Sequence, residues 1–405
     1  MADGPLRVAW ISFFPVEWLP DLPAELNGLP RLHPATWQRV LLDELKQRPD
    51  LKLDIIAVRK HFPRHVSFAR EGVNFHCLKV PGGFRTLSLF WWETFLIRRR
   101  LKAIAPDLVH SWGTERGAAL VASRCPYPYL VTMQGLLEWY SQLVNLGRYM
   151  KVETLLERTC LRRASVVTVE SDFGVGWLRQ HYPHLEVRQV EHAPAWPFHT
   201  LQRRPVAGPL QFLFVGFPSP IKGTDLLLRA LDRLCPELDF RLTLVGAPNP
   251  GFLDPLKQTT SKTLWERILL KENLTQEQVA GEMAATTIML FPTRADNSPN
   301  SVKEAAAAGL PVVASRLGGI PDYIKPNLNG VLFASEDLEG FIQAIRTAAA
   351  HPLFSRGRVD PETLQEARRY LSPKKMADGF VTAYRHAAGR KRGSQPARPG
   401  PGTDT

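Results

Sequence analysis

The chain has 405 residues, of which 44% are hydrophobic and 22% charged, and its 51 basic and 39 acidic residues leave a formal net charge of +12. This composition excludes a largely disordered chain, the length indicates two or three domains, and no apolar run approaches the ~18 residues needed to cross a bilayer. The positive charge points to an acidic partner such as a nucleotide, a phosphate group or an anionic membrane face.

The first half of the chain alternates short apolar runs with amphipathic stretches. The runs have the length and composition of buried strands, and the stretches, such as residues 36–46, have helical spacing. Strands that alternate with helices indicate parallel βαβ units, in which both faces of the sheet are covered. The predicted strands are residues 6–14, 53–59, 107–111, 129–132 and 166–170.

A polar segment rich in Pro and Gly, residues 199–209, predicts a domain boundary. Beyond it the same alternation restarts, which predicts a second domain of similar architecture. Because open parallel sheets bind ligands beyond the carboxyl ends of their strands, we expect the site to lie in a cleft between the domains. The predicted strands of the second half are residues 211–215, 241–245, 288–291 and 311–314, and its predicted helices include residues 225–234 and 301–308.

The first connection of interest follows the strand at 211–215. Gly216 ends that strand and would let the backbone approach a ligand. Lys222 precedes a helix whose predicted N-cap is Thr224 or Asp225. An ammonium group beside free helix N–H groups favours an anion, so this loop is a candidate phosphate site, although a solvated loop lysine is the ordinary alternative.

The second connection carries two carboxylates at the start of a helix. Asp296 lies in the loop, and Glu304 falls in the first helical turn if Asn300 or Ser301 is the cap. Carboxylates accept strong hydrogen bonds from hydroxyl groups, so the pair could hold sugar hydroxyls. Ser301 and Glu304 also have capping-box spacing, in which Glu304 would bond a backbone N–H instead. Both interpretations stay open.

Several short motifs then occur in a fixed order, and together they resemble family 4 of the glycosyltransferases. The resemblance extends over residues 6–388 and is closest from 211 to 335. The motifs are residues 106–110 (PDLVH), Val215-Gly216 with Lys222-Gly223, residues 244–246 (LVG), residues 296–308 (DNSPNSVKEAAAA), and residues 311–314 (PVVA) with residues 318–321 (GGIP).

This resemblance implies the GT-B fold, an α/β fold of two Rossmann-like parallel-sheet domains that face each other across a cleft. We place an acceptor-side domain at residues 1–204 and a nucleotide-sugar-binding domain at residues 205–373. A C-terminal helix at residues 374–388 would cross back to the first domain. The basic, Gly- and Pro-rich residues 389–405 are predicted to be a disordered tail.

The resemblance also implies roles for individual residues. Lys222 would contact the donor diphosphate, with Gly216 and with Asn297 and Ser298, whose main-chain N–H groups could face the sugar or phosphate. Glu304 would bind the ribose hydroxyls, and Asp296, at the first acidic position of the family's E-x7-E pattern, would contact the donor sugar. Lysine and helix N–H groups would stabilise the departing nucleoside diphosphate, so we expect no bound metal and no other cofactor.

Some positions depart from the family pattern. Phe217 stands where a basic residue often follows Val-Gly, and Gln134 stands where relatives carry a histidine in a His-Gly pair. Gln134 can hydrogen-bond but cannot ionise near neutral pH. His110, at the end of a predicted strand, is our third catalytic candidate beside Asp296 and Glu304, and a structural histidine is the alternative.

Residues 87–104 mix aromatic and basic side chains on one predicted helix. Trp91, Trp92 and Phe95 precede the arginines at 98–100. A basic amphipathic helix of this kind could lie on an anionic membrane. In most helices the aromatics belong to the core and the arginines face solvent, and we expect that arrangement here.

These observations predict a retaining, hexosyltransferase-type glycosyltransferase that moves a sugar from a nucleotide-sugar donor to an acceptor hydroxyl. The acceptor would be a glycan or a lipid-linked saccharide of a cell-surface glycan or lipopolysaccharide, and we expect no nucleic-acid partner. Two alternatives are a sugar-nucleotide epimerase on the same fold and a degenerate, non-catalytic binding subunit. The four separated cysteines and the absence of a secretory signal predict a cytoplasmic protein, which could also lie peripherally at the inner membrane face.

Overall fold

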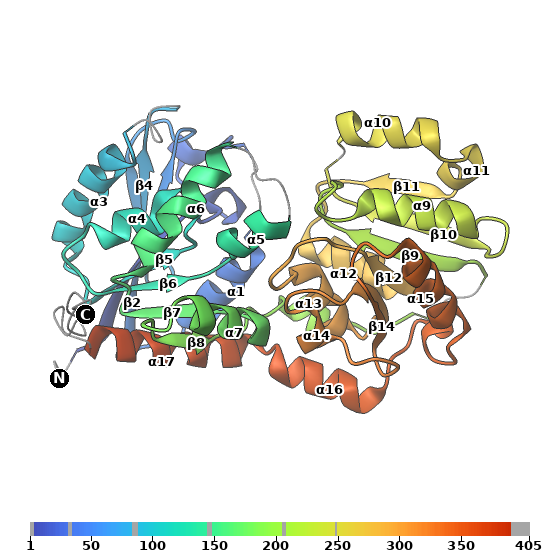
Figure 1. The fold of residues 1–405 in the computed structure, drawn as a ribbon. Helices are drawn as coiled ribbons and strands as arrows, with labels where there is room; N and C mark the ends of the chain where they lie inside the picture. The colour runs from blue at the N-terminus through green and yellow to red at the C-terminus, as the bar shows by residue number, and fades with distance from the viewer. Residues whose placement is uncertain are drawn as a thin grey trace, which may run out of the picture.

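The computed structural model of the chain describes residues 4–30, 35–82, 88–143, 148–204, 208–247 and 249–389. Two α/β units lie side by side, one from each half of the chain, and the last helix runs beneath the first unit (Figure 1). Of the tail predicted at 389–405, only Gly389 is described, and it ends the last helix; the rest lies outside the described residues.

The first unit is built on a sheet with the strand order β3-β4-β2-β1-β5-β6-β7-β8, in which β3 pairs antiparallel with β4 and the other pairs are parallel. Its central strands are buried along nearly their whole length, as expected where helices cover both faces. The strands are β1 (Leu6–Ser12), β2 (Leu51–Arg59), β3 (Val66–Arg70), β4 (Val73–Lys79), β5 (Leu108–Trp112), β6 (Tyr129–Thr132), β7 (Val166–Val169) and β8 (Val187–Gln189).

The helices of the first unit follow the strands in the predicted alternation. Those described are α1 (Thr36–Leu45), α3 (Trp91–Ile104), α4 (Ala118–Ser123), α5 (Leu137–Leu143), α6 (Arg148–Leu161) and α7 (Asp172–His181), with the short 3-10 helices η1 (Val16–Trp18), η2 (Ala24–Leu26) and η3 (Glu115–Gly117).

The second unit is a parallel sheet with the strand order β11-β10-β9-β12-β13-β14. Because β9 and β12 are neighbours, the loops that leave their carboxyl ends meet at one edge of the sheet. The strands are β9 (Leu210–Val215), β10 (Phe240–Val245), β11 (Ile268–Lys271), β12 (Ile288–Phe291), β13 (Val312–Ser315) and β14 (Gly330–Phe333).

Most of the longer helices of the second unit bury an apolar face, and α13 is buried on all sides from Val302 to Ala308. In α9, for example, Leu227 and Leu231 are fully buried and Arg233 is exposed on the other side. The described helices are α9 (Thr224–Leu234), α10 (Pro250–Thr259), α11 (Lys262–Trp265), α12 (Gln276–Ala284), α13 (Asn300–Ala308), α14 (Ile320–Tyr323), α15 (Leu338–Ala350), the 3-10 helix η4 (Phe354–Arg356) and α16 (Pro361–Tyr370).

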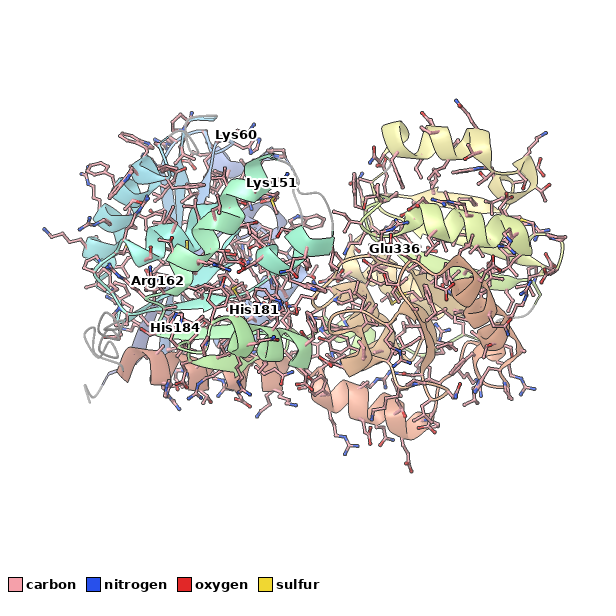
Figure 2. The ribbon with its side chains drawn as sticks, in the orientation of Figure 1. Lys60, Lys151, Arg162, His181, His184 and Glu336 are labelled. Carbon is pink, nitrogen blue, oxygen red and sulfur yellow. The ribbon has the colours of Figure 1, made fainter. Side chains whose placement is uncertain are left out.

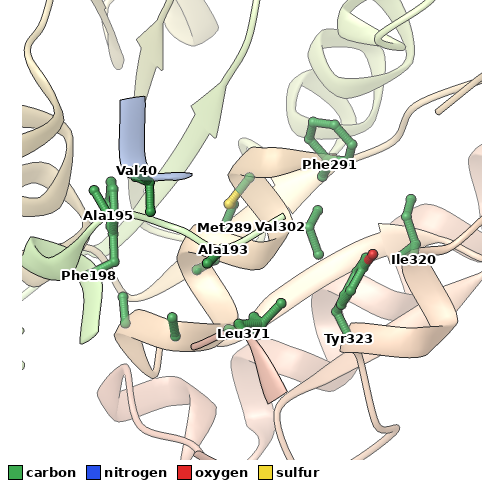
Figure 3. Close-up of a cluster of buried hydrophobic side chains, with 14 of the residues drawn as sticks. Val40, Ala193, Ala195, Phe198, Met289, Phe291, Val302, Ile320, Tyr323 and Leu371 are labelled. Atoms are coloured by element: carbon green, nitrogen blue, oxygen red, sulfur yellow. The ribbon is translucent and has the colours of Figure 1, made fainter. Parts of the chain in front are cut away.

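The chain crosses between the units twice. After β8 it forms the short helix α8 (Trp196–His199), which packs on α12 and α13. Phe198 belongs to the same buried cluster as Met289 and Val302 of the second unit and Val40 of α1 (Figure 3). The long helix α17 (Pro373–Gly389) then runs back along the first sheet and packs on α1, β5, β6 and β7 (Figure 1). The two units therefore share one continuous apolar core.

Candidate functional site

Lys222 lies in the loop between β9 and α9. The next residue, Gly223, has φ +67°, and a Cβ there would lie 1.8 Å from the carbonyl oxygen of Pro292 at the end of β12. Only glycine therefore lets these two loops approach so closely. Gly223 also occupies the N-cap position of α9, so our assignment of that cap to Thr224 or Asp225 is wrong.

Asp296 lies in the loop after β12 and forms an ion pair with Lys222. The Asp296 side chain is 11% exposed and that of Lys222 is 30% exposed. A third loop, after β13, closes on the pair: Gly318 has φ +53°, and a Cβ there would lie 2.0 Å from the carbonyl oxygen of Asp296. The structure therefore brings the predicted ammonium group and the first predicted acid into direct contact.

Glu304 lies in the second turn of α13, at the same edge of the sheet. The helix begins at Asn300 after Pro299 and has no side-chain cap, so the capping-box interpretation of Ser301 and Glu304 is wrong. The Glu304 side chain is buried, and the described residues offer it no hydrogen-bond or ion-pair partner. Burial raises the pKa of Glu304 to about 8, and the neighbouring Lys303 opposes that rise. A buried acid without a partner is a group available to a ligand.

Three further predicted site residues, Gly216, Asn297 and Ser298, each make hydrogen bonds within the protein. The Gly216 N–H donates to the carbonyl of Val245 at 2.9 Å, which continues the sheet ladder. The Asn297 N–H donates to the Tyr140 hydroxyl at 3.0 Å, and the Ser171 hydroxyl donates to Asn297 Oδ1 at 2.8 Å. The Ser298 hydroxyl belongs to the buried network described in the next paragraph. Asn297 and Ser298 thus join the two units, while the buried Asn297 Nδ2 has no hydrogen-bond partner among the described residues.

A buried network of charges that sequence reasoning missed crosses between the two units. Lys303 of α13, fully buried, pairs with Glu170, which follows β7, and with Glu191, which follows β8, at 3.3 Å. Glu170 also pairs with His192 at 3.1 Å. The Ser298 hydroxyl lies 3.0 Å from Glu170 and 2.6 Å from the Tyr323 hydroxyl, and Tyr323 donates to Glu191 at 3.0 Å.

The electrostatics of this network favour an ionised Lys303–Glu170 pair. Burial opposes the charge on Lys303, but Glu170 and Glu191 outweigh it and raise the Lys303 pKa. Burial likewise opposes ionisation of Glu170, and His192 and Lys303 outweigh it and lower the Glu170 pKa. For Glu191, burial prevails, with Glu170 adding to it, and its pKa rises to about 7. The network therefore holds the 296–298 loop against the first unit with matched charges.

His110 does not lie with the other candidates. Its side chain is fully buried between β5 and α17, with Nδ1 2.8 Å from the Tyr384 hydroxyl and Nε2 2.7 Å from Thr132 Oγ1. Burial, with His192 adding to it, lowers the His110 pKa well below its usual range. Both ring nitrogens are occupied, so the geometry supports the structural-histidine alternative and not our catalytic assignment.

We expect His110→Ala to lower the free energy of unfolding by about 2–4 kcal/mol, because it leaves a cavity and removes one hydrogen-bond partner from each of the Tyr384 and Thr132 hydroxyls. Turnover per folded molecule should stay within about twofold of the parent. Chemical denaturation and a turnover assay on the same preparation check this. A large loss of turnover in a stable variant would return His110 to the catalytic group.

The loops of the first unit bring another acid to the same region. Glu115 follows β5 and accepts a hydrogen bond from the Gly135 N–H at 3.1 Å, beside Gln134 in the loop after β6. Burial raises the Glu115 pKa to about 7, with Glu153 contributing. Tyr140 of α5 lies near both Asp296 and Glu115, and burial raises its pKa well above the usual range. Tyr140 therefore lies between Glu115 of the first unit and the 296–298 loop of the second unit.

Two family profiles match successive parts of this chain. The profile described as Glycosyltransferase Family 4 matches residues 39–192, and that described as Glycosyl transferases group 1 matches residues 209–351. The chain belongs to glycosyltransferase family 4. Lys222, Asp296 and Glu304 all lie in the second matched segment.

Two relatives of this family 4 chain are D-inositol 3-phosphate glycosyltransferases. That of Thermobifida fusca is 28% identical over 195 residues, which span 46% of this chain but only 44% of the relative. That of Mycobacterium marinum is 27% identical over 345 residues, which span 80% of this chain and 70% of the relative.

Solved structures show the fold. The sucrose-phosphate synthase of Thermosynechococcus elongatus has a TM-score of 0.77 at 18% identity, covering 94% of this chain and 98% of its own. Anabaena Alr3699/HepE, solved in complex with UDP-glucose, has a TM-score of 0.69 at 15% identity, covering 93% and 99%. The predicted GT-B architecture of the family 4 chain, two parallel-sheet α/β domains, is confirmed.

The described part of this family 4 chain lacks two features that would bear on its ligands and surroundings. Its His, Cys, Asp and Glu side chains form no group of three or more that could hold a metal ion. None of its helices combines the length and apolarity that a bilayer span requires.

Lys303, Glu170 and Tyr140 are the residues near the site that sequence reasoning missed. Glu170 had a usable signal, because it is the last residue of a predicted strand, at the binding edge of the sheet. Lys303 had a weaker one, as the charged residue next to Glu304 at the start of the alanine-rich part of α13. Nothing near Tyr140 in the sequence marks it.

Proposed function

We propose that this protein is a retaining glycosyltransferase that binds a nucleotide sugar at the binding edge of the second sheet and transfers the sugar to an acceptor hydroxyl. The observation that carries the proposal is the ion pair of Lys222 with Asp296 of the loop that leads into α13, the helix that holds the buried, unpartnered Glu304. A cation can bind a diphosphate. The two carboxylates can accept hydrogen bonds from the hydroxyl groups of a hexose and of a ribose.

In this proposal the Lys222–Asp296 ion pair separates when the donor binds. Lys222 turns to the diphosphate, and Asp296 turns to the hydroxyls of the donor sugar. Negative charge grows on the leaving diphosphate in the transition state, so an ammonium group placed there lowers the barrier more than it tightens ground-state binding. The N-termini of α9 and α13, which start at this edge, add a favourable field. The chain's own groups thus supply the stabilisation that a metal provides elsewhere, and we expect turnover to persist in EDTA.

Glu304 gives the proposal a pH signature. Its pKa of about 8 means that the free protein carries Glu304 mostly protonated at pH 7. Two ribose hydroxyls donate best to a carboxylate, so donor binding would favour the ionised form and release a proton. We therefore expect the Kd for the nucleotide to fall as the pH rises from 6 to 8. Calorimetry in buffers of different ionisation enthalpy measures both the affinity and the proton release.

The matched control for this signature is Glu304→Gln, which keeps the shape and removes the titration. The variant should bind more weakly and show no proton release from this site. Proton release that persists unchanged in Glu304→Gln would assign it to another group and remove Glu304 from the ribose site.

The reaction itself is tested with a panel of nucleotide sugars. Calorimetry finds the donor that binds, and a nucleotide-release assay with glycan and lipid-linked acceptors then measures transfer. The proposal expects acceptor-dependent release of a nucleoside diphosphate and a product of unchanged anomeric configuration. A converted nucleotide sugar without any acceptor would indicate an epimerase, and binding without turnover would indicate a binding subunit.

The acceptor we propose is a growing cell-surface glycan or its lipid-linked precursor. Such acceptors are assembled at a membrane, so the protein would work in the cytoplasm and at the inner membrane face. The basic excess of the chain is compatible with an anionic lipid surface.

A further inference from the structure

Helix α3 presents aromatic side chains to solvent on the outer side of the first unit. Trp91 is 56% exposed, Trp92 44% and Phe95 57%, so our expectation that these aromatics pack in the core is wrong. The helix is anchored by its other face, where Ile97 and Leu101 are buried. Figure 1 shows α3 on the side of the first unit that faces away from the second, and Figure 2 shows its side chains projecting outward.

The same face of α3 continues as a row of cations. Arg98, Arg99 and Lys102 are exposed, and none has an ion-pair partner among the described residues. The one acid of the helix, Glu93, is buried on the opposite face. Elsewhere in the described chain, by contrast, many exposed arginines are paired, as Arg233 is with Glu339. The α3 face therefore combines an apolar half with uncompensated positive charge.

We propose that this face of α3 docks the protein on an anionic phospholipid surface. Indole and phenyl rings partition into the headgroup region, and arginines and lysines beside them attract anionic lipid. A protein partner would be expected to bring its own carboxylates to unpaired arginines, but the exposed rings at the helix N-terminus are better matched by lipid. This inference rests on the proposed function in one respect only, namely that the proposed acceptor is assembled at a membrane.

The N-terminal end of this α3 face lies near the loop after β5, which belongs to the proposed acceptor-side domain. Phe90, which precedes α3, packs against Gly117 in the loop after β5, where an added Cβ would lie 2.4 Å from its ring. A small hollow lined by Phe90, Arg116 and Ser12 opens at the same edge of the first sheet. A membrane under α3 would therefore lie close to the loops that carry Glu115.

The test is sedimentation of the full chain with vesicles of phosphatidylcholine alone or mixed with phosphatidylglycerol. The parent should bind only the anionic vesicles, and added salt should weaken binding. Trp92→Ser with Phe95→Ser should lower the partition coefficient by about 100-fold or more, since each buried ring contributes about tenfold or more by the apolar scale. Arg98→Glu with Arg99→Glu should lower it by about 25-fold or more, at about fivefold per lost basic residue.

Two matched variants control for nonspecific effects. Trp196→Ser removes an aromatic ring that is 54% exposed on α8, and Arg179→Glu with Arg241→Glu reverses two exposed charges elsewhere. Both should bind vesicles as the parent does. Equal losses in the α3 and control variants, or vesicle binding that needs no anionic lipid, would overturn the proposal, as would a concentration-dependent dimer that the α3 variants dissolve.

Nucleotide binding by the same α3 variants in solution keeps this proposal separate from the proposed function. They should bind the donor as the parent does, because α3 contributes no residue to the second unit. Loss of vesicle binding with intact donor binding supports the docking face, and vesicle binding by a protein that binds no nucleotide would refute sugar transfer but not docking.

Discussion

Replacing Lys303 with methionine is expected to lower the free energy of unfolding by about 3–5 kcal/mol. Lys303 is fully buried and compensates Glu170 and Glu191 at the contact between the two units. Its removal leaves two carboxylates in a site from which water is excluded, and only His192 and hydroxyl groups remain beside them. Urea denaturation at pH 7 and again near pH 5 measures the loss, which should shrink at the lower pH as the stranded acids take up protons.

The control for this loss is Lys325→Met, which removes a half-exposed lysine paired with Glu366. An exposed pair of this kind contributes about 0–1 kcal/mol, so this variant should stay close to the parent. Adding Glu170→Gln and Glu191→Gln to Lys303→Met should recover about half of the lost stability or more. If Lys303→Met alone is as stable as Lys325→Met, the network does not join the two units as described.

Replacing Lys222 with alanine is expected to lower kcat by about 10²–10³-fold, with a much smaller change in the Kd for the donor. The reason is that diphosphate charge grows during transfer, so the ammonium group acts chiefly in the transition state. Asp296→Asn should behave differently: it frees Lys222 from its ion pair, so affinity for a free nucleoside diphosphate should be kept or rise while sugar transfer falls. Steady-state kinetics and calorimetry on both variants measure these outcomes.

Lys271→Ala is the matched control for Lys222. Lys271 is also about one-third exposed and pairs with Glu282 at 2.6 Å, but it lies at the end of the edge strand β11. Its replacement should leave kcat within about twofold of the parent. Equal effects of the two alanine variants would mean that Lys222 acts through stability or overall charge and not at the diphosphate.

Much of the fold could be predicted because buried parallel strands appear in the sequence as short apolar runs. The predictions at 129–132 and 288–291 match β6 and β12 residue by residue. The hairpin of β3 with β4 was missed, because β3 lies at the sheet edge with alternating exposure and carries a weaker apolar signal.

The candidate site could be predicted only where its residues stand at strand ends or in ordered motifs. Lys222, Asp296 and Glu304 meet this condition. The caps at Thr224 and Ser301 were wrong because the approach of Gly223 to Pro292, and the position of Pro299 before α13, are properties of packing and not of local spacing. His110 has the same strand-end signal as a functional residue, and its burial depends in part on α17, which is distant in sequence.

The most direct measurement of the central claim is a crystal structure of the protein with its bound donor, or with the nucleoside diphosphate that binds best. We predict Lys222 Nζ within hydrogen-bonding distance of a diphosphate oxygen, the Glu304 carboxylate on the ribose hydroxyls, and Asp296 turned away from Lys222. A nucleotide seated elsewhere, with the Lys222–Asp296 ion pair intact and Glu304 still without a partner, would contradict the account.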